Sequence, residues 1–157
     1  MVVVGIIGLI ICFVGIGRLN LFAENNELQL LCSELNDFKR YESKKAGLEE
    51  TKSQSWEVGE KIVAYKEEAI PSLIDIYKNN DSLIAQLFAA RLVAEIDFIK
   101  GKRLLENFRD DKRTIETIFG CQIDVMTISA VATKEIAILE GQRKKIESTQ
   151  DHLKSKI

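Results

Sequence analysis

The first seventeen residues, Met1 to Gly17, contain no charged residue and no strongly polar side chain. A helix of that length spans about 25 Å, and extension to Phe22 gives about 33 Å, against roughly 30 Å of bilayer hydrocarbon. A single spanning segment has to be helical, because its backbone must satisfy its own hydrogen bonds inside lipid. Residues 1–22 are therefore predicted to form a transmembrane anchor, with Arg18 near the far interface.

Three other interpretations of this segment make different demands on the sequence. A cleaved signal peptide usually begins with a basic residue, which is absent before Arg18. The small residues from Gly15 to Gly17 nevertheless suit a cleavage site, so cleavage stays open. A lipoprotein anchor on Cys12 requires a small residue just before it, and Ile11 stands there. A dinucleotide-binding turn requires a third glycine, which the run from Gly15 to Asn20 lacks.

Four small residues recur at spacings of three and four within the anchor: Gly5, Gly8, Cys12 and Gly15. This spacing places them on one face of a helix, where small side chains let membrane helices approach closely. The face is a candidate packing surface for self-association, and the alternative is that glycine is simply common in spanning helices. The flanking charges differ by about one, which favours a single-pass protein with its C-terminal domain in the cytoplasm and leaves the opposite orientation open.

The remainder of the chain is rich in charge and poor in residues that break helices. Lys+Arg is 22 and Asp+Glu is 24, which gives a net charge of -2 and argues against nucleic acid as a partner. There is one proline, and Leu, Ile, Ala, Glu and Lys dominate. We predict an all-α fold, in which an N-terminal transmembrane helix is followed by a small helical-hairpin or bundle domain with a long C-terminal helix.

Apolar periodicity divides the chain further. Asn25 to Glu42 reads as an amphipathic helix, because apolar residues repeat there at helical spacing. Pro71 marks the start of a second helix, and Asn80-Asp81 marks a turn before a third. The predicted parts are the anchor over 1–22, an amphipathic helix and connector over 23–54, a helical-repeat-like or bundle region over 55–110, and a long helix over 111–157.

The last third of the sequence carries a three-four repeat of apolar positions from Ile115 to Ile157. Such a repeat is typical of a coiled-coil-like seam. The first half is predicted to pack on its own domain, and the half after Gly141 to project towards a partner helix. The alternative is a solvated, fraying terminus. The candidate partner seam comprises Ile136, Leu139, Ile146 and Leu153.

Residues 58–96 contain a pattern seen in one class of helical repeats. Residues 69–74 read Ala-Ile-Pro-Ser-Leu-Ile, Asn80-Asp81 follows, and an alanine-rich run begins at Ala89. This order resembles one HEAT-type repeat, which has a proline-started first helix and an alanine-rich second helix. The arginine common early in the second helix is Ala85 here, and no second copy is visible, although solenoids need several.

A second resemblance covers about residues 48–76 together with the anchor. Leu48-Glu49-Glu50, then Trp56, then Ile70 to Ile74 is similar in order and spacing to the LemA family. That resemblance implies a membrane-anchored helical protein with one N-terminal spanning helix. The basic pair usual before the Ile-Pro is absent, as are the family's later tyrosine motifs. The two resemblances agree on packed helices and differ on architecture.

No catalytic, cofactor-binding or metal-binding constellation is visible in the sequence. His152 is the only histidine, so a histidine-centred triad or a zinc motif is unsupported. The three cysteines are scattered, and neither Cys32 nor Cys121 has a base beside it in sequence. The chain is therefore predicted not to be an enzyme and to need no cofactor.

The sequence favours a membrane-anchored, non-catalytic helical protein that mediates protein–protein interaction as a scaffold or adaptor. Its expected partners are the lipid bilayer, through residues 1–22, and an unidentified protein. The alternative is a self-associating structural membrane oligomer, whose copies pair through the anchor and the C-terminal helix.

Overall fold

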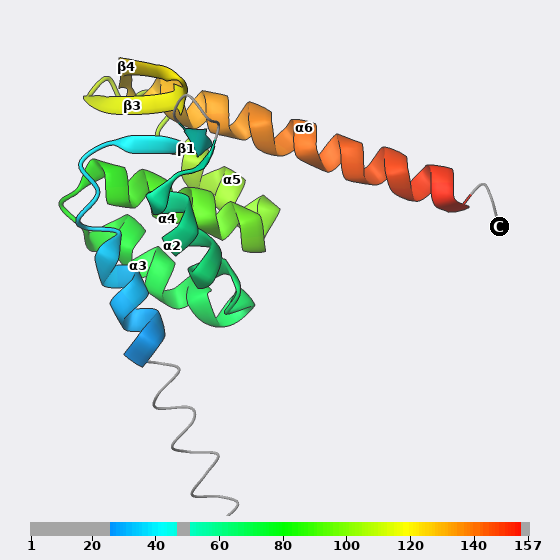
Figure 1. Cartoon of the computed structure of the whole chain (residues 1–157), viewed down its shortest axis with the longest axis horizontal. Coiled ribbons are helices and arrows are strands. Elements are labelled where there is room, and N and C mark those ends of the chain that lie inside the picture. The colour runs from blue at the N-terminus through cyan, green and yellow to red at the C-terminus, as the bar shows by residue number, and fades with distance from the viewer. Residues whose placement is uncertain (1–25, 47–50, 155–157) are drawn as a thin grey trace, which may run out of the picture.

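The computed structural model describes residues 26–46 and 51–154, in which helices pack beneath a small sheet and α6 extends beyond them (Figure 1). The chain begins with a helix over residues 26–34. The elements that follow are β1 (Tyr41–Ala46), β2 (Thr51–Lys52), α2 (Gln54–Val63), the 3-10 helix η1 (Lys66–Ala69), α3 (Ile70–Asn79), α4 (Leu83–Ile96), α5 (Phe98–Glu106), β3 (Thr114–Gly120), β4 (Gln122–Thr127) and α6 (Ile128–Lys154).

The sheet has the strand order β2-β1-β3-β4, so that β4 forms one edge. Strand β1 runs parallel to β3, and the β1–β2 and β3–β4 pairs are antiparallel. Phe119 lies opposite Gln122, which leaves a two-residue turn of Gly120 and Cys121 between β3 and β4. Gly120 has φ +60, a left-handed conformation that glycine adopts without steric cost.

The prediction of an all-α fold is wrong, because the residues from Thr114 to Thr127 form a β-hairpin. Ile115, Ile118 and Val125 fit a three-four spacing, which is why this segment was interpreted as helix. The same segment is rich in β-branched residues, which pack well on a pleated sheet. The long C-terminal helix therefore begins at Ile128 and not near residue 111.

The predicted amphipathic helix from Asn25 to Glu42 is also shorter than expected. The described helix ends at residue 34, and Tyr41 begins strand β1. Pairing of Tyr41 with Thr117 of β3 fixes this segment as a strand, so a contact distant in sequence decides its conformation. The apolar positions that suggested the helix do face the core, since Leu28, Leu31, Cys32 and Leu35 are buried.

Residues 1–22, with the proposed packing face of Gly5, Gly8, Cys12 and Gly15, lie outside the described residues. Within the part of the chain that the structure describes, no helix combines the length and the apolar character needed to cross a membrane.

Helix α4 is the centre of the core, and nine of its fourteen residues are buried. Ser82 caps its N-terminus by accepting a hydrogen bond from the N–H of Ala85. An aromatic cluster joins α4 to the sheet and to α2, because the Phe88 ring lies 5.8 Å from Tyr41 and 5.3 Å from Trp56. These contacts join β1, α2 and α4 into one packed unit. We call this unit the body, and the first half of α6 packs against it.

Candidate functional site

Helix α6 consists of two parts with opposite environments. In its first half, five residues are buried against the body: Ile128, Val131, Ala132, Glu135 and Leu139. Every residue from Gly141 to Gln150 is exposed. We call residues 141–154 the arm, and Figure 1 shows it extending beyond the rest of the molecule. The side chains of residues 151–154 lie outside the described part.

The packed half of α6 is fixed to α4 by a buried ion pair. Arg91 Nε lies 2.6 Å from Glu135 Oε2, and the two side chains are only 1% and 2% exposed. Arg91 Nη2 also lies 2.9 Å from Glu95 Oε1. The Arg91 guanidinium carbon is 5.0 Å from the centroid of the Trp56 ring. Charge and cation–π contact therefore lock the helix at one position.

Two groups of this cluster, Arg91 and Tyr41, keep their protonation states at physiological pH. Burial alone would lower the pKa of Arg91, but the negative charge of Glu135 and the neighbouring groups raise that pKa above its ordinary value. Burial, followed by the charge of Glu135, raises the pKa of Tyr41 well above its ordinary value. Arg91 therefore stays charged and Tyr41 stays protonated. Because Arg91, Glu135 and Tyr41 are almost fully buried, the cluster joins α6 to the core of the body.

Two contacts mark where the body stops supporting α6. Lys102 of α5 lies 2.6 Å from Glu140 across a cavity of about 250 Å³ between α5 and α6. Arg143 places its guanidinium carbon 4.8 Å from the Phe98 ring centroid, at the first residue of α5. Since Arg143 sits at the start of the arm, most of the arm extends past α5.

The structure separates the four residues of the predicted seam. Ile136 is partly buried against the core and Leu139 is 5% exposed, so both are used within the chain. Ile146 is 59% exposed. The backbone of α6 includes position 153, but the Leu153 side chain lies outside the described part. The exposed seam is thus shorter than the sequence suggested.

The arm carries an uncharged stripe that continues the core-facing side of α6. At 3.6 residues per turn, Gln142, Ile146, Thr149 and Gln150 follow the direction set by Leu139. The charged residues lie beside this stripe or on the other faces of the helix: Arg143, Lys144, Lys145 and Glu147. The stripe is therefore uncharged on the same side as the half that packs, and Ile146 is its one large apolar side chain among the described residues.

A polar groove of about 500 Å³ lies between the helix over residues 26–34 and α3. Gln29 donates to Ser72 across it at 3.3 Å, and Asn80 donates to Asn36. Besides these carboxamides and hydroxyls, the lining includes Asp75, whose carboxylate accepts a hydrogen bond from Asn79 at 2.8 Å. The groove can hydrogen-bond a ligand, and sequence reasoning missed it because its two walls are distant in sequence.

The described residues contain no group of three or more His, Cys, Asp or Glu side chains placed to hold a metal ion. Burial raises the pKa of the Cys32 thiol to about 11, which keeps it protonated and unreactive. Cys121 is exposed in the β3–β4 turn. The His152 side chain lies outside the described part.

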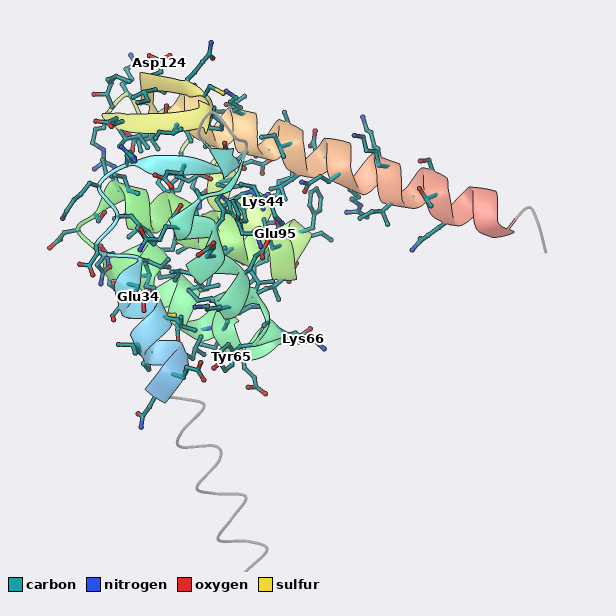
Figure 2. All side chains as sticks on the ribbon, viewed as in Figure 1. Glu34, Lys44, Tyr65, Lys66, Glu95 and Asp124 are labelled. Atoms are coloured by element: carbon teal, nitrogen blue, oxygen red, sulfur yellow. The ribbon has the colours of Figure 1, made fainter. Side chains whose placement is uncertain are left out.

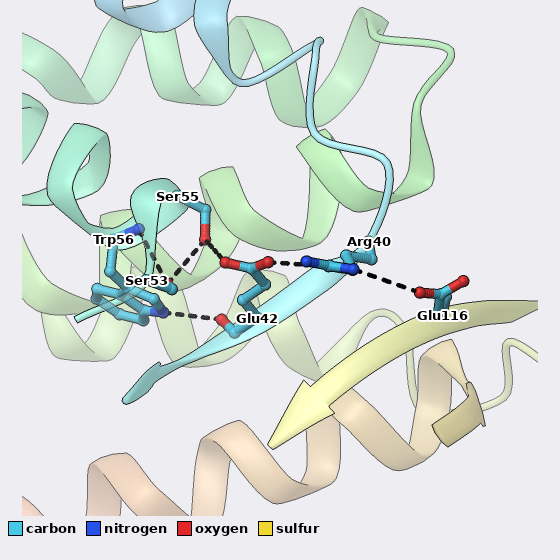
Figure 3. A network of polar contacts seen from close by, with 6 residues as sticks. All are labelled: Arg40, Glu42, Ser53, Ser55, Trp56 and Glu116. Atoms are coloured by element: carbon cyan, nitrogen blue, oxygen red, sulfur yellow. Dashed lines mark hydrogen bonds and ion pairs between the residues drawn. The ribbon is translucent and has the colours of Figure 1, made fainter. Parts of the chain in front are cut away.

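A polar network covers the β1 side of the sheet (Figure 3). Arg40 lies 2.9 Å from Glu42 and 3.9 Å from Glu116, which links β1 to β3. Trp56 Nε1 donates to the backbone oxygen of Glu42 at 2.9 Å, and Ser55 donates to its carboxylate at 3.4 Å. The side chains of this network are therefore paired within the chain.

Strand β4 differs from β1 because it is exposed along most of its length. Ile123 and Val125 are 68% and 66% exposed, which is high for large aliphatic side chains. Sequence reasoning did not single out these residues, because it placed them in a helix. They are the two most exposed large hydrophobic side chains among the described residues.

No family model matches the chain, and no curated protein matches it either. The resemblances to HEAT-type repeats and to the LemA family therefore stay predictions from short stretches of sequence.

Proposed function

We propose that this chain is an interaction protein that docks a partner protein on the uncharged stripe of the α6 arm. The observation that carries this proposal is the contrast within one helix. The stripe around Ile146 continues the side that buries Leu139, yet Ile146 is 59% exposed. The proposal assigns no chemistry to the chain.

Helix energetics support a docking role for the arm. An isolated helix shorter than about 12–15 residues is marginal in water, and most helices are stabilised by packing an apolar face. The arm has its stripe but little of its own body to pack on, since Arg143 makes its contact with α5 at the first residue of that helix. A partner that covers the stripe supplies the missing packing.

Site-specific photo-crosslinking in cells tests this proposal. A photoreactive residue at Gln142 lies on the stripe, and one at Ser148 lies on the opposite face and serves as the matched control. We expect a discrete crosslinked product from position 142 that is absent from position 148. Ile146→Glu should abolish that product, and Ser148→Glu should preserve it. Equal crosslinking from both faces, or none from either, contradicts the proposal.

Self-association is an outcome that the same experiment identifies. A crosslinked product with twice the mass of the chain would favour the self-associating oligomer over the adaptor.

The membrane location stays a prediction from residues 1–22. Carbonate extraction of cell membranes tests it independently of the arm, because release of the chain into the supernatant contradicts membrane insertion. Protease protection of the C-terminal domain then gives the orientation.

A further inference from the structure

Strand β4 forms an edge of the sheet, and the outer side of its backbone pairs with no other strand among the described residues. In an antiparallel hairpin, residues alternate between pairs that exchange hydrogen bonds and pairs that do not. Because the two-residue turn makes Phe119 and Gln122 a hydrogen-bonded pair, the N–H and C=O groups of Ile123 and Val125 point away from β3. β4 is the last strand in the sheet order, so no strand lies beyond it among the described residues.

The side chains of the same two residues form an apolar surface beside this edge. Ile123 and Val125 alternate with Asp124 and therefore lie on one face of the sheet. Ile118 lies directly opposite Ile123 on β3 and is itself buried. The edge thus offers main-chain hydrogen bonds and adjacent aliphatic contacts, which are the two requirements for adding a strand.

Asp124 sets the charge of the edge. Its carboxylate accepts a hydrogen bond from the N–H of Val125 at 2.7 Å, and it forms no ion pair within the described residues. Figure 2 shows Asp124 at the top of the molecule. A second copy fits poorly, because the antiparallel register that pairs Ile123 with Val125 of the other copy places the two Asp124 carboxylates opposite each other.

We propose that β4 binds an extended segment of a partner protein in which a lysine or arginine lies between two aliphatic residues. The cation lies opposite Asp124, and the aliphatic residues lie against Ile123 and Val125. On binding, the N–H of Val125 transfers its hydrogen bond from the Asp124 carboxylate to a carbonyl of the incoming strand. The carboxylate then pairs with the cation. This surface is separate from the α6 arm and does not depend on it.

Two synthetic peptides test the proposal on the full-length chain. Both are capped at their ends and share a threonine–valine–X–valine–threonine sequence, with X either lysine or glutamate. We expect the lysine peptide to shift the amide NMR signals of Ile123 and Val125 and to bind about fivefold more tightly than the glutamate peptide. A lysine peptide N-methylated at the backbone should not bind, because it cannot donate the strand hydrogen bonds.

Charge-reversal variants distinguish specific recognition of the peptide from nonspecific binding. Asp124→Lys should reverse the preference so that the glutamate peptide binds more tightly. Glu67→Lys makes the same charge change at an exposed residue of η1, at the opposite end of the body from β4, and should leave the preference unchanged (Figure 2). Equal binding of both peptides, shifts elsewhere than β4, or the absence of binding at millimolar peptide overturns the proposal. None of these outcomes affects the photo-crosslinking test of the arm.

Discussion

The two halves of α6 belong to one helix, and the side that carries Leu139 in the first half carries Ile146 in the second. That side is buried in the first half and exposed in the second. In the packed half, Leu139 is 5% exposed and Glu135 completes a buried ion pair. In the arm, Ile146 is 59% exposed. The difference lies in the neighbours, because α5 begins at Phe98 and supports α6 only as far as Arg143. A periodic apolar pattern therefore predicts which side of a helix packs, but not where its support ends.

The largest effect is expected from breaking the buried ion pair. Arg91→Met leaves Glu135 buried without its partner, which should cost about 3–5 kcal/mol of unfolding free energy. Urea unfolding of the full-length chain measures this cost. The double variant Arg91→Met with Glu135→Leu should recover much of the loss, because the fully buried carboxylate is gone and Glu95, which also loses Arg91, has a side chain that is 24% exposed. A double variant that is less stable than the single one contradicts this account.

A matched pair of truncations compares the two halves directly. Leu139→Ala removes a buried side chain and should destabilise the fold by about 2–5 kcal/mol. Ile146→Ala removes a mostly exposed side chain and should change stability by less than about 0.5 kcal/mol. Thermal or urea unfolding distinguishes the two, and comparable losses would mean that the arm packs on its own chain.

Replacement of two glycines by alanine should change stability in opposite directions. A Cβ at Gly101 would lie 2.1 Å from the backbone nitrogen of Ala94, so Gly101→Ala should force α4 and α5 apart at a cost of about 1–3 kcal/mol. A Cβ at Gly141 meets nothing within 4 Å. Gly141→Ala should therefore raise the helicity of the arm measured by circular dichroism and stabilise it by about 0.5–1 kcal/mol.

The smallest effect concerns the ion pair at the border between the halves. A hydrogen bond from Lys102 lowers the pKa of Glu140, so the folded state binds a proton there less readily than the unfolded state. The contribution to stability is present at neutral pH and is lost as pH falls through the lowered pKa, below the ordinary glutamate range. Glu140→Gln should weaken the dependence of the unfolding free energy on pH in this range. An unchanged pH dependence would show that the ion pair contributes nothing to stability.

Several elements were predictable from local signals. Pro71 lies in the first turn of α3, and the turn at Asn80-Asp81 precedes α4, both as the sequence indicated. The hairpin from Thr114 to Thr127 was missed, because the spacing of its apolar residues also fits a helix. Strand β1 has little alternation of its own and depends on β3, which is distant in sequence.

The candidate surfaces were harder to predict than the helices. The sequence did not single out Glu135 or Arg91, and only the fold brings them together in the core. Ile136 and Leu139 read as available to a partner, but the body uses them. Ile123 and Val125 became candidates only once the segment was known to be an edge strand.

Amide hydrogen exchange along α6 tests the central contrast most directly. In the full-length chain without a partner, amides of the packed half from Val131 to Glu140 should exchange slowly, at rates close to those of global unfolding. Protection should fall sharply after Gly141 and approach that of an isolated helix by Gln150. Uniformly slow exchange through Gln150 would contradict the account, because it would show that the arm is already packed.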